Sequence, residues 1–218
     1  MDIYRRVGAL AGMLGPLLFV ATFTIEGWLR PGYDPAGMYI SALSLGSRGF
    51  IQIINFIALG VLLLVFVRGV AADMGKSATV GIAVLACIAI SFVVSVPFVM
   101  DPVTVLPALM STHSKIHYLL GAIVFGLGPV SCFAFFNHFR QAPDWRWFRW
   151  WTLCVGIAMV IGIGFLKAAQ LSASPLHAWI GAIQRAALIP WLTWVFAFGV
   201  ALYRRAGLVG KASGDHAA

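Results

Sequence analysis

Three histidines and one aspartate in the polar connections between apolar runs have the types and spacing of a metal site. His113 and His117 are four residues apart, so on a helix they would share one face. Ser111 or Thr112 can cap that helix, and the helix N-terminus disfavours extra positive charge, which favours the neutral, metal-binding form of both imidazoles. Asp101 and His177 could complete the set of three histidines and one carboxylate that zinc accepts.

The histidine pair is also compatible with simpler functions. It lacks the glutamate of the HExxH motif, and an HxxxH spacing is frequent by chance. The main alternative places the histidines at a membrane interface, hydrogen-bonded to loop carbonyls and lipid headgroups, and a further one is that they bind protons or a ligand. A zinc-dependent membrane hydrolase, in which Ser41 or Ser44 assists substrate binding, is therefore the second hypothesis of function.

Three charged residues lie near the ends of apolar runs on the same side as the histidines. They are Glu26, Lys167 and Arg185. Long side chains such as lysine and arginine can extend to the interface, whereas a glutamate is too short to do so. We therefore expect Glu26 to have a cationic partner, with Lys167 or Arg185 as the candidates.

The runs that must position these residues are long enough to cross a membrane. The chain has 218 residues, of which 61% are hydrophobic and only 10% are charged, against roughly 25% charged residues in a soluble domain. The pattern predicts an all-α, polytopic membrane protein, a bundle of six transmembrane helices in a single domain spanning residues 1–207. The expected spans are Val7–Trp28, Phe50–Val70, Ala78–Met100, Ile116–Phe136, Phe148–Leu171 and Ile183–Tyr203.

The distribution of lysine and arginine predicts the orientation, because cytoplasmic loops carry the excess of positive charge. Ten flanking residues fall on the side of both termini: Arg5, Arg6, Arg68, Lys76, Arg140, Arg146, Arg149, Arg204, Arg205 and Lys211. Five fall on the other side: Arg30, Arg48, Lys115, Lys167 and Arg185. We therefore expect both termini in the cytoplasm, a location in the cell membrane, and a disordered cytoplasmic tail over residues 208–218.

The leading hypothesis is a pocket that opens to the outside and binds a lipid headgroup or a small solute. If the helices pack closely, the polar residues of the outer connections lie at one depth, beneath a first outer connection that is rich in turn formers. The candidate binding residues are Glu26, Tyr33, Ser41, Ser44, Lys167 and Arg185. The same data leave open whether the protein is an enzyme, a binding protein or a transporter that acts as a homo-oligomer.

Two other classes are disfavoured. The net charge of +8 is spread over membrane flanks and does not form one face, so nucleic acid is not an expected partner. The histidines gather on one side of the expected bilayer, which does not suit a haem held at depth between helices.

One stretch of the sequence resembles a known family. The segment RPGYDPAGMYISALSLGSRGFIQIINF, the pair Asp101–Pro102 and His117 near the start of the fourth run are similar to a bacterial and archaeal family of six-span membrane proteins, catalogued as domain of unknown function 998. The similarity extends from about Gly8 to Tyr203. It implies a six-helix fold, and no catalytic residue can be carried over because the family has no assigned activity.

Overall fold

The apolar runs form long helices in the computed structural model, which describes residues 2–102, 104–171 and 173–214. The α-helices of this described part are α1 (Asp2–Leu29), α2 (Gly49–Met74), α3 (Thr79–Val94), α4 (Thr112–Gln141), α5 (Arg149–Ala169) and α6 (Ile180–Gly214). Short 3-10 helices lie between them: η1 (Ile40–Ser44), η2 (Gly75–Ala78), η3 (Pro107–Leu109), η4 (Pro143–Phe148) and η5 (Pro175–Trp179). The expected all-α class is therefore confirmed.

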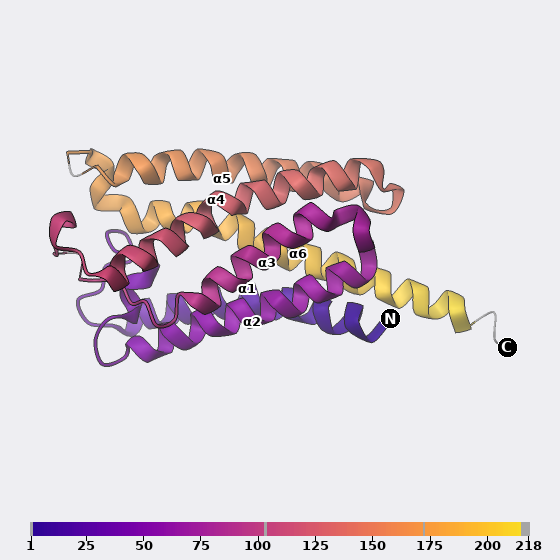
Figure 1. Cartoon of the computed structure of the whole chain (residues 1–218), viewed down its shortest axis with the longest axis horizontal. Coiled ribbons are helices and arrows are strands. Elements are labelled where there is room, and N and C mark those ends of the chain that lie inside the picture. The colour runs from indigo at the N-terminus through magenta and orange to yellow at the C-terminus, as the bar shows by residue number, and fades with distance from the viewer. Residues whose placement is uncertain (1, 103, 172, 215–218) are drawn as a thin grey trace.

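The α-helices pack as a closed ring. Each packs against its neighbours in the sequence, and α6 also packs against α1 (Figure 1). The beginning of α1 and the end of α6 lie at one end of the bundle, which we call the terminal end. The connections 30–48, 95–111 and 170–179 lie at the opposite end, which we call the loop end.

Five helical segments are long and apolar enough to cross a membrane. They are Ile3–Leu29, Gly49–Val94, Thr112–Gln141, Pro143–Ala169 and Pro175–Gly207. The second contains both α2 and α3, which meet at Gly75, where a positive φ of 58° reverses the chain. The chain is therefore built as a multi-pass membrane protein.

The largest differences from the predicted boundaries are at the end of α3 and the end of α6. The third expected span continues to Met100, but α3 ends at Val94, because Pro97 has no N–H to continue the helical hydrogen bonds and the chain turns there. At the other end of the chain, α6 continues to Gly214 into the tail that was expected to be disordered, and residues 215–218 lie outside the described part.

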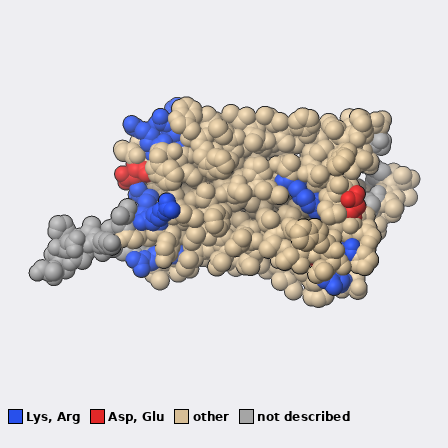
Figure 2. All heavy atoms as spheres, turned by 180° about the vertical axis from the view of Figure 1, so that it is seen from behind, with Lys and Arg blue, Asp and Glu red and all other residues tan. Residues whose placement is uncertain are grey.

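Charged side chains gather at the two ends of the bundle and leave an apolar band between them (Figure 2). At the terminal end, Asp73 of α2 lies between Arg5 of α1 (3.4 Å) and Arg205 of α6 (3.3 Å). Arg205 also pairs with Asp144 of η4 (3.1 Å) and lies over the ring of Trp145. These contacts join the first, second and last helices and the turn before α5.

Of the four tryptophans in the 144–151 segment at this end, three lie on the surface and one lies in the core. Trp147, Trp150 and Trp151 are exposed, as expected of an interfacial aromatic belt. Trp145 is only 2% exposed and stacks on Phe139 with ring centroids 5.2 Å apart. Unlike these three indoles, Trp145 is turned into the core by η4.

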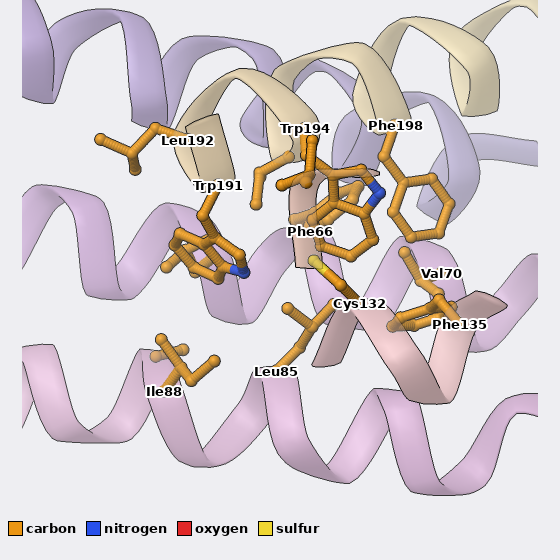
Figure 3. Packing of buried hydrophobic residues seen from close by; sticks show 14 of the residues in the cluster. Phe66, Val70, Leu85, Ile88, Cys132, Phe135, Trp191, Leu192, Trp194 and Phe198 are labelled. Carbon is orange, nitrogen blue, oxygen red and sulfur yellow. The ribbon is translucent and has the colours of Figure 1, made fainter. Parts of the chain in front are cut away.

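The core is formed by aromatic side chains of α2, α4 and α6. Phe66, Phe135 and Phe198 meet there (Figure 3). The ring centroid of Phe198 lies 5.2 Å from that of Phe66 and 5.1 Å from that of Phe135. The buried indole N–H groups are also satisfied, since Trp191 donates to Ser131 Oγ (3.0 Å) and Trp194 to Thr152 Oγ1 (2.9 Å).

Helices α1 and α2 approach most closely where two glycines face each other. A Cβ atom built on Gly8 would overlap the backbone of Gly69, and one built on Gly69 would overlap that of Gly8. In lipid, where the hydrophobic drive between helices is absent, small residues permit this backbone contact. By contrast, a Cβ on Gly164 of α5 would meet nothing within 4 Å.

The substitution Gly8→Ala should separate α1 from α2 and destabilise the bundle by about 1–3 kcal/mol, the usual cost of overpacking. The thermal unfolding of detergent-solubilised protein measures this change. The matched control Gly164→Ala should unfold at the temperature of the wild type. Equal behaviour of the two variants would show that the glycine contact does not matter.

Candidate functional site

The loop end is organised around one buried carboxylate. Glu26 is 3% exposed and accepts hydrogen bonds from Arg30 Nη2 (2.9 Å), Arg48 Nε (2.9 Å) and Arg48 Nη2 (2.7 Å). The two bonds from Arg48 reach different carboxylate oxygens, which is the bidentate arrangement that arginine favours. Arg30 Nη1 also donates to the Leu45 carbonyl (2.8 Å). The prediction of Lys167 or Arg185 as the partner of Glu26 is therefore wrong.

Arg185 of α6 binds the backbone of the first loop instead. Its Nη1 donates to the carbonyl oxygens of Pro35 (2.7 Å) and Met38 (3.1 Å), and its Nη2 donates to the Tyr33 hydroxyl. The guanidinium lies 5.6 Å from the ring centroid of Phe23 and 5.8 Å from that of Tyr33. The charge is thus held by carbonyls and aromatic faces.

Tyr33 completes this contact from the loop side. Burial raises the pKa of its hydroxyl in spite of the neighbouring Arg185 charge, so the group stays protonated and donates to the Tyr39 carbonyl (3.1 Å). Burial likewise raises the pKa of Tyr39 to about 12. Both tyrosines therefore act as neutral structural groups.

The loop docks directly on the first turns of α6. The Ala182 N–H donates to the Ala36 carbonyl (2.9 Å), and the Ile40 N–H donates to Gln184 Oε1 (2.8 Å). A Cβ atom on Gly181 would overlap the Met38 carbonyl oxygen, so only glycine permits this approach. The 33–40 segment is consequently fixed across the seam between α1 and α6.

A cavity of about 70 Å³ lies beneath this loop. Most of its wall is aromatic or aliphatic, and its polar groups are Ser41, Ser91, Ser95, His117 and Gln184. The remaining lining residues are Phe19, Ile40, Phe56, Phe92, Leu120, Gly121, Val124, Phe125 and Leu188. An apolar wall with a few polar groups is typical of small-molecule sites.

His117 is the polar residue of this cavity with the clearest chemical capacity. Its Nδ1 lies 2.8 Å from the Phe98 carbonyl oxygen. Because a carbonyl can only accept, Nδ1 carries a proton, and Nε2 is the acceptor of the neutral ring. The ring packs beside Phe56 and Tyr118, each with a centroid 6.3 Å away.

Two polar side chains beside the cavity wall are fully enclosed. Asn55 Nδ2 donates to the Phe19 carbonyl (3.1 Å) and to Gln52 Oε1 (3.3 Å). Gln52 is 0% exposed, and its Nε2 has no hydrogen-bond partner within the described residues. Neither amide lines the cavity, but Asn55 binds the backbone of Phe19, whose side chain does.

Asp101 stabilises the beginning of α4 and does not point to a metal site. Its carboxylate accepts from the Ser111 N–H (2.7 Å) and hydroxyl (2.8 Å), and its own N–H donates to Ser114 Oγ (3.1 Å). The Ser111 hydroxyl in turn caps α4 by accepting from the Ser114 N–H. The hydrogen bonds from Ser111 lower the pKa of Asp101.

The other expected metal ligands contact separate backbone carbonyls. His113 Nδ1 lies 3.0 Å from the Pro97 oxygen, and His177 Nδ1 lies 3.0 Å from the Ala169 oxygen. Over residues 2–102, 104–171 and 173–214, no three histidine, cysteine or acidic side chains come together as a metal-binding group. The expected zinc set is thus not assembled among these residues. His113 and His117 contact carbonyls of the turn after α3, and His177 contacts the last carbonyl of α5.

The predicted binding residues do not come together at one site either. Lys167 is exposed and donates to Gln170 Oε1 (3.2 Å), outside the cavity. Ser44 is buried and donates to the Ser41 carbonyl (2.6 Å). Ser41, whose hydroxyl donates to Met100 Sδ (3.2 Å), is the one predicted binding residue that lines the cavity.

Sequence reasoning missed Ser91, Ser95 and Gln184 as lining residues. The two serines are four residues apart at the end of α3, which was a detectable signal, because a polar pair on one helix face is unusual in an apolar span. Nothing in the spacing of Gln184 points to the Ile40 N–H that it binds.

Replacing Glu26 by glutamine should destabilise the protein by about 3–5 kcal/mol, because two arginines then lose their buried countercharge. The unfolding midpoint of the solubilised protein measures the loss. Lys167→Gln is the control and should leave the midpoint unchanged, since that amine is exposed. A Glu26→Gln protein as stable as this control would contradict the assigned role.

Asp101 should make stability depend on pH. Its folded pKa lies below the usual 3.8, so its contribution is complete above that value and is lost as the pH falls through the folded pKa. The difference in unfolding temperature between wild type and Asp101→Asn should therefore be largest above about pH 4 and should shrink under more acidic conditions. A difference that is constant with pH would contradict this assignment.

Comparison with known proteins places the chain in a family. A family model described as "Protein of unknown function (DUF998)" matches residues 13–201. No curated protein and no solved structure matches the chain. The matched range contains most of α1, all of α2 to α5 and most of α6, together with the first loop and the cavity beneath it. The chain therefore belongs to the DUF998 family, whose function is unknown.

Proposed function

We propose that the protein is a six-span protein of the cell membrane with both termini in the cytoplasm. Ten lysines and arginines were counted in the flanks of the terminal side and five on the loop side, and such an excess of positive charge is retained on the cytoplasmic side. The reversal at Gly75 supports two separate passes for α2 and α3. In this orientation the loop end faces outward.

The proposed function of the loop end is to bind a small solute, or one polar group of a lipid, in the cavity beneath the first loop. The observation that carries this proposal is the position of His117 in a cavity whose wall is otherwise mostly apolar. Among the described residues its Nδ1 contacts the Phe98 carbonyl, and its Nε2 has no hydrogen-bond partner. An apolar wall with a few placed polar groups fixes the orientation of an amphipathic ligand.

The size of the cavity limits the ligand. A volume of about 70 Å³ holds several water-sized groups, given that one water needs about 10–15 Å³ on this measure. That is room for a small solute or for the end of a longer molecule whose remainder lies among the lipids. A neutral His117 ring would accept a hydrogen bond from a ligand hydroxyl, and a protonated ring would donate to an anionic oxygen.

The arginine contacts around the loop support this function by fixing the roof of the cavity. Arg185 holds residues 33–38, and Arg30 holds Leu45. Ile40 and Ser41 lie between these attachments and line the cavity. A roof held on both sides gives the site a defined shape before the ligand arrives, which reduces the ordering cost of binding.

Filling the cavity should prevent binding. Gly121 lines it, and a Cβ atom there would meet nothing within 4 Å, so Gly121→Leu should occupy the space without a clash. We expect the small molecules that co-purify with the wild type, identified by mass spectrometry of an organic extract, to fall at least about tenfold in this variant, equivalent to about 1.4 kcal/mol of binding free energy.

Gly164→Leu is the matched control, because its site is equally open but lies outside the cavity. His117→Leu provides a second variant that removes the polar group and keeps the wall apolar. Retention of the same molecules at the wild-type level by both Gly121→Leu and His117→Leu would refute the proposed site.

A further inference from the structure

A second cavity lies at the terminal end, far along the bundle from the one beneath the first loop. It is a groove of about 470 Å³ between η2 with the first turn of α3 and the last turns of α4. Its volume falls within the range of about 300–1,000 Å³ that is usual for ligand pockets. The lining residues are Lys76, Ser77, Ala78, Thr79, Val80, Gly81, Ala134, Asn137, His138, Gln141 and Ala142.

One face of α4 forms a polar wall of this groove. Asn137, His138 and Gln141 follow Ala134 at spacings of three, four and seven residues, so all four lie on the same side of the helix. Lys76 of η2 adds an exposed ammonium group from the opposite wall, and it has no ion-pair partner among the described residues. These side chains present amide, imidazole and ammonium N–H groups as donors.

The hydroxyl groups of the groove are already committed to the backbone. Ser77 Oγ donates to the Met74 carbonyl (2.6 Å), and Thr79 Oγ1 donates to the Lys76 carbonyl (2.7 Å). These bonds keep the η2 turn closed and hold the Lys76 backbone in place. His138 is also engaged, through a hydrogen bond with the Ser77 backbone. The donors left for a ligand are therefore the nitrogen groups of Lys76, Asn137 and Gln141.

No acidic residue lines the groove. The nearby carboxylate that interacts electrostatically with His138 is that of Asp73. This carboxylate forms ion pairs with Arg5 (3.4 Å) and Arg205 (3.3 Å). Because two arginines offset the negative charge of Asp73, the ammonium group of Lys76 gives the groove a positive potential. A donor-rich concave surface with positive charge attracts an anion.

We propose that this groove binds a phosphate group, carried either by the headgroup of an anionic lipid or by a free phosphate compound. The ammonium group of Lys76 pairs with the phosphate charge, and the amides of Asn137 and Gln141 donate to its oxygens. The groove lies at the edge of the apolar band, where the headgroups of the inner leaflet are found when the termini are cytoplasmic. The site is separate from the loop-end cavity, so either can exist without the other.

The test uses the full-length protein in nanodiscs of neutral phosphatidylcholine and of equal parts phosphatidylcholine and phosphatidylglycerol. Binding of inorganic phosphate is measured by calorimetry in the neutral discs, and retained phosphatidylglycerol is measured by native mass spectrometry after release from the mixed discs. Phosphate binding in the neutral discs identifies a free phosphate compound, whereas selective retention of phosphatidylglycerol identifies the lipid headgroup.

The double variant Lys76→Gln and Asn137→Leu should weaken whichever interaction is found by about tenfold or more, as expected when a charged partner is removed. Lys115→Gln, which removes an exposed ammonium at the opposite end of α4, should behave as the wild type. The proposal is overturned if the wild type binds neither probe, or if the double variant binds as tightly as Lys115→Gln.

Discussion

A carboxylate buried inside a membrane bundle must be neutralised by the protein, because its apolar surroundings supply neither water nor countercharge. Two carboxylates meet this constraint in the same way, each between two arginines. Glu26 lies between Arg30 and Arg48 at the loop end, and Asp73 lies between Arg5 and Arg205 at the terminal end. Each cluster joins segments that are distant in the sequence, so the two clusters fix the ends of the ring and leave its middle to apolar packing.

Helix packing in the middle of the bundle depends on complementary shapes, because the hydrophobic effect does not drive helices together among lipid tails. The facing glycines Gly8 and Gly69 bring α1 and α2 together at backbone distance. On the far side, the indoles of Trp191 and Trp194 fill the core and bind hydroxyls of α4 and α5. These contacts close the ring of helices, and none of them involves a charged side chain.

Hydropathy was enough to predict the helical class and the approximate position of the long helices, because both depend on composition along the chain. The family followed instead from the resemblance of the 30–56 segment, Asp101–Pro102 and His117. Docking of the first loop over a pocket was also expected. The partners of Glu26 were not predictable, since Arg48 lies 22 residues away and meets it only after the loop folds back. The histidines share a side of the membrane, but their Nδ1 atoms face separate carbonyls, which no spacing rule reveals.

The loop that covers the cavity is attached to a residue made much later in synthesis. Arg185 lies 150 residues after Pro35, whose carbonyl it binds, and ribosomes add about 5–20 residues each second. The loop therefore exists for roughly 8–30 s without its final attachment. During that interval the cavity has an unfinished wall, because α6 supplies Gln184 and Leu188. Insertion of α6 thus completes the wall of the cavity and attaches the first loop above it at the same time. A chain that stops before α6 would lack both this part of the wall and the Arg185 contacts to the loop.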